Sequence, residues 1–233
     1  MLTLAILAGG LATRLHPITK TIPKSLINVC GKPFIIRQLE YFSKQGGKKV
    51  VLCNGYLGKM IKDLVGTGER YGLEVSYSED WPLLMGTGGA IKKAIPLLSK
   101  NFFVIYGDSY LPINFNTVEL SYIKSKKKAL MTIQKNENRW DKSNVIFDGQ
   151  ILEYNKKISK PEMSYIDYGL GIFCSSIFDR YPIDKPFDLG DVYFDLSKNR
   201  ELAGFEVHDR FFEIGSKSGL KEAENYFLIK DTL

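Results

Sequence analysis

The first 15 residues of the chain, MLTLAILAGGLATRL, decide its fold class. An apolar run from Leu2 to Leu7 is followed almost at once by Gly9 and Gly10. This run predicts a buried strand, because it is far shorter than the roughly 18 residues that a membrane span requires. A glycine-rich turn after a strand offers backbone N–H groups to phosphate oxygens, and its missing side chains allow a close approach. The segment therefore predicts a strand that leads into an anion-binding turn.

Short apolar runs recur along the first half and alternate with amphipathic segments. The expected strands are 2–7, 49–53, 73–77 and 101–106, and the expected helices are 33–45, 58–65 and 88–98. Continuous Val, Ile and Leu runs are typical of strands that helices cover on both faces. The pattern predicts an α/β fold with a Rossmann-like, mostly parallel central sheet, flanking helices and right-handed crossovers.

The second half changes character. Expected strands at 129–134, 144–148, 150–154 and 165–173 surround an Asp148-Gly149 turn signal, and we expect them to add antiparallel strands to the same sheet. Further strands are expected at 205–209 and 211–215, and helices at 192–199 and 216–228. Because no low-complexity linker or internal repeat divides the chain, we expect residues 1–233 to form a single domain.

Composition narrows the possible functions. A hydrophobic content of 44% with 25% charged residues is typical of a globular protein and not of a disordered one. The net charge of +6 suits phosphates but is modest for a nucleic-acid binder, and the basic cluster at 124–128 contains no aromatic residues. Three widely separated cysteines indicate neither a disulfide scaffold nor a zinc site. We expect a cytoplasmic protein with no nucleic-acid or membrane partner.

Basic side chains follow the glycine turn. Arg14 can grip phosphate oxygens through its planar fork, and Lys24 adds a compact charge, so the two together could neutralise a triphosphate. The turn has neither the Walker A spacing nor the GxGxxG spacing. Taken alone, the two glycines are equally consistent with a plain tight turn.

The longer stretch LAGGLATRLHPITKTIPKSLINVCGKPFI, residues 7–35, closely resembles the signature of the sugar-1-phosphate nucleotidylyltransferases. Further matches at 86–98, 102–111, 165–173 and 211–223 extend the resemblance over nearly the whole chain. Residues 86–94 are similar to heptose-1-phosphate guanylyltransferases, and residues 55–78 resemble N-acetylmuramate-1-phosphate uridylyltransferases. The resemblance implies that a nucleoside triphosphate and a sugar 1-phosphate are converted to an NDP-sugar and pyrophosphate.

The resemblance also implies a role for each matching residue. Residues 1–115 would mainly bind the nucleotide and residues 116–233 the sugar phosphate, with no C-terminal β-helix. The implied catalytic residues are Arg14, Lys24 and Asp108; the nucleotide-binding residues are Leu7, Ala8, Gly9, Gly10, Thr13, Gly86, Thr87 and Gly88; the sugar-phosphate-binding residues are Asn144, Lys156, Asp167 and Gly169; and the ligands of a Mg²⁺ cofactor are Asp108 and Glu213. Lys157 competes with Lys156, and Asp167 could equally be a hydrogen-bonded acid at a strand edge.

Three departures from the family pattern are Ala12 for Gly, Ser25 for Pro and Glu213 for Asp. Because an alanine rarely adopts the left-handed backbone conformation, we expect a right-handed or extended φ at Ala12. The departures at 12 and 213 leave an alternative hypothesis, that the chain is a catalytically silent regulatory subunit that binds nucleotide sugars. The retained Arg14, Lys24 and Asp108 argue against this alternative. A glycosyltransferase would carry Asp-x-Asp where this chain has Asp108-Ser109-Tyr110.

The substrates follow from the resemblance alone. We expect GTP with heptose 1-phosphate or mannose 1-phosphate, in the synthesis of a surface polysaccharide, with UTP or CTP as the alternative nucleotide. A homo-oligomer is compatible with the sequence, which leaves the oligomeric state open.

Overall fold

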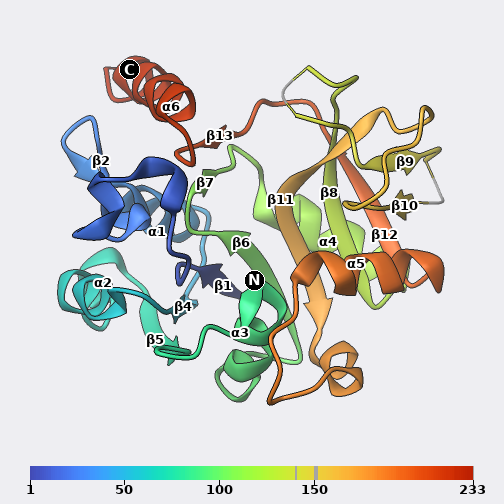
Figure 1. The fold of residues 1–233 in the computed structure, drawn as a ribbon, viewed down its shortest axis with the longest axis horizontal. Coiled ribbons are helices and arrows are strands. Elements are labelled where there is room, and N and C mark those ends of the chain that lie inside the picture. Colours follow the sequence, from blue (N-terminus) through green and yellow to red (C-terminus); the bar gives the residue numbers. More distant parts are fainter. Residues whose placement is uncertain (140, 150–151, 233) are drawn as a thin grey trace.

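The computed structural model describes residues 1–139, 141–149 and 152–232. Within these residues, nine strands form one sheet of order β10-β9-β11-β6-β1-β4-β5, which β8 and β12 extend from β11 (Figure 1). The strands are β1 (Thr3–Leu7), β4 (Lys49–Asn54), β5 (Glu74–Glu79), β6 (Asn101–Tyr106), β8 (Ala129–Lys135), β9 (Val145–Phe147), β10 (Leu152–Tyr154), β11 (Tyr165–Cys174) and β12 (Leu202–Val207). The sheet therefore takes strands from both halves of the chain.

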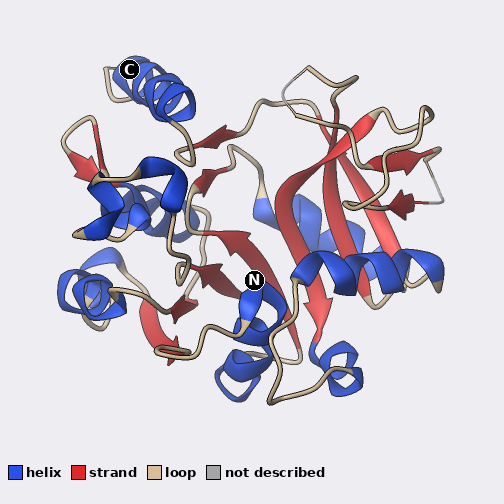
Figure 2. Cartoon of the chain, viewed as in Figure 1, coloured by secondary structure: helices blue, strands red, loops and turns tan. Residues whose placement is uncertain are grey.

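Helices cover both faces of this sheet (Figure 2). They are α1 (Phe34–Lys44), α2 (Gly58–Val65), α3 (Gly86–Ala94), α4 (Phe115–Ser125) and α5 (Leu189–Lys198). The last helix, α6 (Lys217–Lys230), packs outside this sheet, in a third core with Phe34 and Tyr110. Successive side chains of a strand point to opposite faces. Leu4 and Ile6 accordingly pack in one core with α1, α2 and α4, whereas Ala5 packs in the other with α3 and α5. Burial on both faces explains why the opening run is continuously apolar.

The order of the strands fixes where a ligand binds. β1 pairs in parallel with β4 on one side and with β6 on the other, and β5 adds in parallel to β4. The chain thus builds outward from β1 in one direction and then returns to its other side, and ligands bind at the carboxyl ends of strands at such a reversal. β11 runs antiparallel to β6 and β8, which confirms the mixed α/β fold class.

Two short ladders were not expected from the sequence. β7 (Ser109–Tyr110) pairs with β13 (Phe212–Glu213), and β2 (Asn28–Val29) pairs with β3 (Lys32–Pro33). The prediction of a strand at 211–215 is therefore wrong in extent, and this strand lies outside the main sheet. Two-residue strands carry no periodicity that a sequence could reveal. Of the strand expected at 150–154, Gln150 and Ile151 lie outside the described residues.

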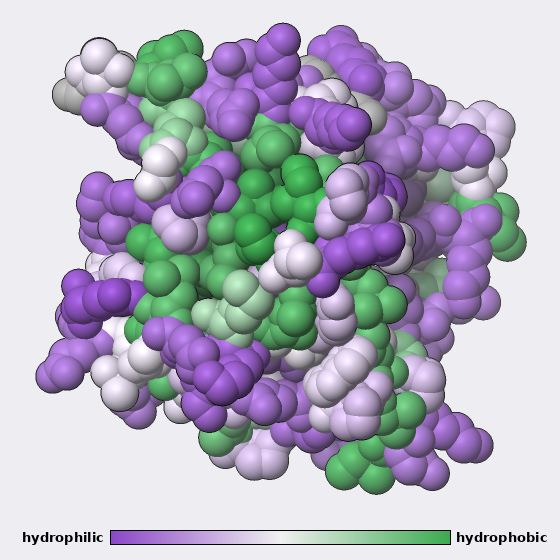
Figure 3. Space-filling model, turned by 60° about the vertical axis from the view of Figure 1, so that its left-hand side comes forward, coloured by the Kyte–Doolittle hydropathy of each residue, from purple (hydrophilic) through white to green (hydrophobic). Residues whose placement is uncertain are grey.

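The surface has an apolar area as well as charged ones. Figure 3 shows one face on which hydrophobic side chains gather in the middle and hydrophilic side chains surround them. An exposed apolar patch is a common contact site for a second molecule, and a homo-oligomer stays a prediction. In the described part of the chain, every helix is too short or too polar to cross a lipid bilayer.

Candidate functional site

Two cavities meet at the carboxyl ends of β1 and β6. The narrower one, of about 220 Å³, contains the glycine turn in its wall, and the wider one has a volume of about 680 Å³. Tyr106 and Asp108 line both. Lys24 and Asp108 line the narrower cavity. So do six of the expected nucleotide-binding residues: Leu7, Ala8, Gly9, Gly10, Gly86 and Thr87. We call these spaces the narrow cavity and the wide cavity.

The glycine turn leaves β1 between its two neighbouring strands. Ala8 N donates a hydrogen bond to Cys53 O at 2.9 Å, and Gly107 N donates one to Leu7 O at 2.8 Å. A Cβ on Gly9 would lie 2.9 Å from Gly55 N, and one on Gly107 would lie 2.9 Å from Leu7 O. Because the segments approach this closely only without side chains, the glycines hold the turn against the ends of both strands.

The expectation for Ala12 is wrong. Its backbone is left-handed, with φ 50° and ψ 43°. Two hydrogen bonds to its carbonyl oxygen hold this conformation, from Thr19 Oγ1 at 2.8 Å and from Leu15 N at 3.1 Å. The turn therefore needs the conformation that glycine adopts readily, and the surrounding contacts impose it on alanine.

Replacing Ala12 with glycine is expected to stabilise the protein. A left-handed alanine costs about 1–2 kcal/mol, whereas the extra freedom of glycine in the unfolded chain costs about 0.4–1 kcal/mol. The free energy of unfolding of Ala12→Gly, measured in urea, should therefore rise by about 0.5–1 kcal/mol. A fall of that size, as an ordinary Ala→Gly change gives, would contradict the strain at this position.

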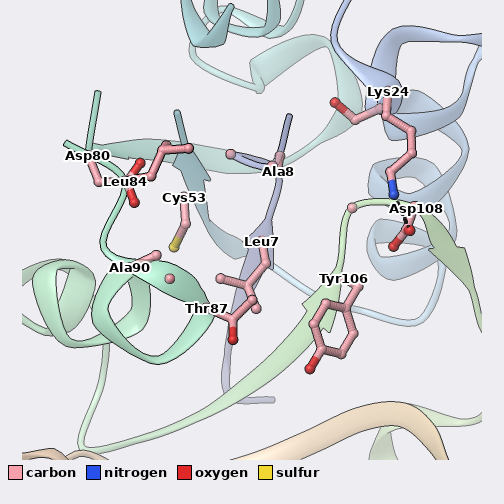
Figure 4. A pocket seen from close by; sticks show the side chains of 15 residues that line it. Leu7, Ala8, Lys24, Cys53, Asp80, Leu84, Thr87, Ala90, Tyr106 and Asp108 are labelled. Atoms are coloured by element: carbon pink, nitrogen blue, oxygen red, sulfur yellow. Dashed lines mark hydrogen bonds and ion pairs between the residues drawn. The ribbon is translucent and has the colours of Figure 1, made fainter. Parts of the chain in front are cut away.

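Charged side chains gather where the two cavities meet. Lys24 Nζ and Asp108 Oδ2 form an ion pair (Figure 4). The Arg14 guanidinium is near the same carboxylate. A Cβ on Gly215 would lie 3.3 Å from Arg14 Nη2 and 3.4 Å from Asp108 Oδ2. Lys24 thus pairs with Asp108 where the cavities join, and Arg14 lies nearby in the wall of the wide cavity.

Glu213 joins this group through the short ladder. It lies opposite Ser109 in the β7–β13 pair, and Ile214 N donates a hydrogen bond to Asp108 O at 2.9 Å. Burial raises the pKa of Glu213, the nearby Asp108 carboxylate raises it further, and Arg14 oppositely lowers it. Both carboxylates line the wide cavity, where the charge of Asp108 disfavours the charged form of Glu213.

This pair of acids fits the ion that the family resemblance implies. Mg²⁺ is normally held by one or two carboxylates together with phosphate oxygens and waters. Among the described residues there is no cluster of three or more His, Cys, Asp or Glu side chains that could hold a metal by itself. Asp108 and Glu213 therefore suit a Mg²⁺ ion that arrives with a phosphate ligand, and its binding stays a prediction.

The expected sugar-phosphate residues line the wide cavity. Gly169 has φ 104°, within an irregularity of β11 between Asp167 and Gly171. This bulge lets Gly169 N donate to Asp167 Oδ1 at 2.9 Å, while Asn144 Oδ1 accepts from Asp167 N at 3.1 Å. Asp167 is thus both a hydrogen-bonded acid of the strand and a wall of the cavity, so the two hypotheses for it are compatible.

The two candidate lysines are placed differently. Lys156 lines the wide cavity and lies 3.8 Å from the carboxylate of Asp188. Lys157 lines a separate groove, which Lys156 also borders, and forms an ion pair with Asp191 at 2.6 Å. The geometry favours Lys156 as the contact for a sugar phosphate.

Asp167 is expected to make stability depend on pH. Burial raises its pKa to about 6, while the Gly169 N–H and Lys156 oppose the shift. From about pH 4 to 6 the native state holds a proton that the unfolded chain has released, so stability falls as pH rises. Asn cannot titrate, so the Tm of Asp167→Asn minus that of the wild type should increase from pH 4 to pH 7. Parallel Tm curves would contradict this.

Sequence reasoning also named residues that lie elsewhere and missed others. Thr13 and Gly88 are not among the described residues that line either cavity, and Gly88 N instead donates to Phe187 O at 3.0 Å. The cavity-lining residues that were missed include Asp80, Tyr106, Arg139 and Arg210. Asp80 directly follows β5 and Tyr106 ends β6, so their positions at the ligand-binding edge of the sheet were the available signal.

The fold and the cavities define an α/β protein with a ligand site at the carboxyl ends of β1 and β6. The comparisons identify it further: residues 4–224 match the model of the nucleotidyl transferase family. The chain belongs to this family and is a nucleotidyltransferase. The family predicted from the sequence is thereby confirmed.

Individual relatives agree with this assignment. The chain is 30% identical to the D-glycero-alpha-D-manno-heptose 1-phosphate guanylyltransferase of Campylobacter jejuni, over 97% of this chain and 98% of the relative. It is 27% identical to the N-acetylmuramate alpha-1-phosphate uridylyltransferase of Neisseria meningitidis, over 94% and 95%. Among solved structures, HddC from Yersinia pseudotuberculosis, complexed with GMP-PN, matches with a TM-score of 0.81 and 27% identity, over 97% of this chain and 100% of that one.

Proposed function

We propose that this nucleotidyltransferase joins GTP to a manno-configured sugar 1-phosphate, releasing pyrophosphate and forming a GDP-sugar. One observation carries the proposal: Asp108 lines both the narrow cavity at the glycine turn and the wide cavity at β11. Lys24 pairs with Asp108 at this shared wall. Guanylyl transfer is the activity named for the heptose 1-phosphate relative, and mannose shares the manno configuration of that heptose.

The chain's own residues would position the substrates and neutralise charge. A phosphate oxygen of the sugar 1-phosphate attacks the α-phosphorus, the bond to the pyrophosphate breaks on the opposite side, and no nucleophilic side chain takes part. Arg14 and the turn amides would hold the β- and γ-phosphates. Lys24, at the junction, would neutralise the charge that develops between the α-phosphate and the incoming oxygen. Lys156 would hold the phosphate of the sugar.

Mg²⁺ at Asp108 and Glu213 would neutralise charge on the phosphate oxygens. In the structure, the Lys24 ammonium group pairs with the Asp108 carboxylate. The lysine would turn from this acid toward the phosphates when they enter, which places its charge at the reacting centre.

The test is pyrophosphate release in the presence of Mg²⁺, measured for the four NTPs in combination with mannose 1-phosphate, heptose 1-phosphate and N-acetylmuramate 1-phosphate. We expect release with GTP and a manno-configured sugar. Release with UTP and N-acetylmuramate 1-phosphate alone would replace the proposed substrates with those of the uridylyltransferase relative. Binding of GDP-sugars with no release from any pair would instead identify a silent regulatory subunit.

The proposed setting is the cytoplasm, where the product would supply the synthesis of a surface polysaccharide. The three cysteines Cys30, Cys53 and Cys174 are free, as suits a reducing compartment.

A further inference from the structure

One buried polar side chain of α1 holds the turn that carries Asp108. Gln38 lies in the middle of this helix, and only 4% of the residue is exposed. Its amide nitrogen Nε2 donates to two backbone carbonyl oxygens, Tyr106 O at 2.8 Å and Ser109 O at 2.6 Å. These two residues flank Gly107 and Asp108. A single amide therefore holds both ends of the turn that follows β6.

Backbone hydrogen bonds hold the middle of the same turn. Gly107 N donates to Leu7 O at 2.8 Å, and Asp108 O accepts from Ile214 N at 2.9 Å. The Asp108 carboxylate itself is paired only through its side chain with Lys24, as Figure 4 shows. In the proposed reaction this lysine turns toward the phosphates. The bonds to the backbone of the turn then remain to hold the acid in place.

α1 is a firm support for the Gln38 amide. Ile35, Leu39 and Phe42 of this helix are fully buried, in the core that also contains Leu4 of β1 and Leu52 of β4. The helix cannot shift without disturbing that core. A group held by a well-packed helix is positioned more precisely than one held by a loop.

The stability of the fold does not by itself account for a glutamine at this position. Gln38 Oε1 is buried and has no hydrogen-bond partner among the described residues. A buried acceptor without a donor is costly, and this cost offsets part of what the two Nε2 bonds contribute. A polar side chain kept at such a cost next to a reacting group indicates a role in the site.

We propose that Gln38 is a positioning residue for Asp108: its amide fixes the turn on both sides of the acid, so that the carboxylate is already in place for the proposed Mg²⁺ ion. Groups that orient a metal ligand in this way typically change metal affinity or activity by about 10- to 100-fold when they are removed. The inference rests on the proposed function, since it concerns the acid that the proposed reaction uses.

The test is Mn²⁺ binding, followed by electron paramagnetic resonance, to the protein saturated with a non-hydrolysable GTP analogue, or with a UTP analogue if pyrophosphate is released with UTP alone. Gln38→Met nearly keeps the length of the side chain and removes both donors. We expect this variant to bind Mn²⁺ about 10- to 100-fold more weakly than the wild type. The Mg²⁺ concentration for half-maximal pyrophosphate release should rise as well, with the KM for the nucleotide little changed.

Gln45→Met is the matched control. Gln45 lies directly after α1, and it donates from Nε2 to Ile113 O at 3.0 Å and accepts at Oε1 from Phe115 N at 3.0 Å. It thus holds the same connecting segment through two hydrogen bonds, but at the end next to α4 and away from Asp108. Its Tm should fall as that of Gln38→Met does, whereas its Mn²⁺ affinity should equal that of the wild type.

Equal Mn²⁺ affinities in the two variants would overturn the inference, because Gln38 would then be a structural contact like Gln45. If Gln38→Met does not fold, a crystal structure of the wild type with Mn²⁺ and the nucleotide analogue decides. Nε2 still bonded to Tyr106 O and Ser109 O, with manganese at Asp108, supports the inference. A turn that has moved away from Gln38 while Asp108 holds manganese overturns it.

The failure of this inference can be told apart from the failure of the proposed function. Weaker Mn²⁺ binding by Gln38→Met, with no pyrophosphate release by the wild type from any substrate pair, would support the inference and contradict only the proposed function. Normal release by the wild type, with wild-type Mn²⁺ affinity in Gln38→Met, would contradict only the inference.

Discussion

Replacing Lys24 with alanine is expected to lower kcat by about 10²–10³, which corresponds to 2.7–4 kcal/mol of transition-state stabilisation. Lys24 lies where the two cavities meet and carries the cation that is paired with Asp108. Its charge would act on the α-phosphorus as the new bond forms, so kcat should fall further than the KM for the nucleotide rises. The measurement is steady-state pyrophosphate release by the purified variant.

The stability of Lys24→Ala should change little. The Lys24 and Asp108 side chains are still 21% and 17% exposed, and Arg14 remains close to the acid. Lys20→Ala is the matched control, because Lys20 is exposed on the neighbouring short 3-10 helix and lines neither cavity. A Lys24→Ala variant with near-normal kcat and an unchanged Tm would show that this cation has no part in the chemistry.

Asp108→Asn should lower kcat by at least about 10²-fold, because it removes a negative charge from the proposed metal site without changing the shape of the side chain. The bond from Ile214 N goes to the backbone oxygen of residue 108 and is kept. The fold should therefore survive, with a Tm close to that of the wild type. In rate measurements across a Mg²⁺ titration, the variant should also need a higher Mg²⁺ concentration for half-maximal activity.

Asp63→Asn controls for the loss of an acid, since Asp63 pairs with Lys59 on the exposed face of α2. It should retain full activity at every Mg²⁺ concentration. If Asp108→Asn and Asp63→Asn gave the same rates and the same Mg²⁺ dependence, Asp108 would be no metal ligand.

Much of the fold could be predicted because it depends on local sequence. The apolar run of β1 and the two glycines after it predicted a buried strand and a turn, and the parallel pairing then implied where a ligand binds. Asp108 closely follows β6 at this edge of the sheet, whereas Lys24 reaches it from a short 3-10 helix far away in the sequence. The expected site residues, except Thr13 and Gly88, accordingly line two cavities that share a wall.

The rest depends on specific contacts, some of them between distant segments. The left-handed backbone of Ala12 is imposed by Thr19 and Leu15, and the amide of Gly88 is taken up by Phe187. The β7–β13 ladder, which puts Glu213 beside Asp108, is two residues long and has no periodicity. Asp80 resembles any acid after a strand until its burial and unpartnered oxygen are seen. Such features follow from tertiary packing, which residue patterns do not encode.

The most direct measurement is a crystal structure of the protein with Mn²⁺ and a non-hydrolysable GTP analogue. Anomalous scattering should place manganese between Asp108 and Glu213, with the β- and γ-phosphates along the backbone from Gly9 to Arg14. Phosphates bound away from this segment, or manganese held by other acids while the Asp108 side chain points elsewhere, would contradict the site described above.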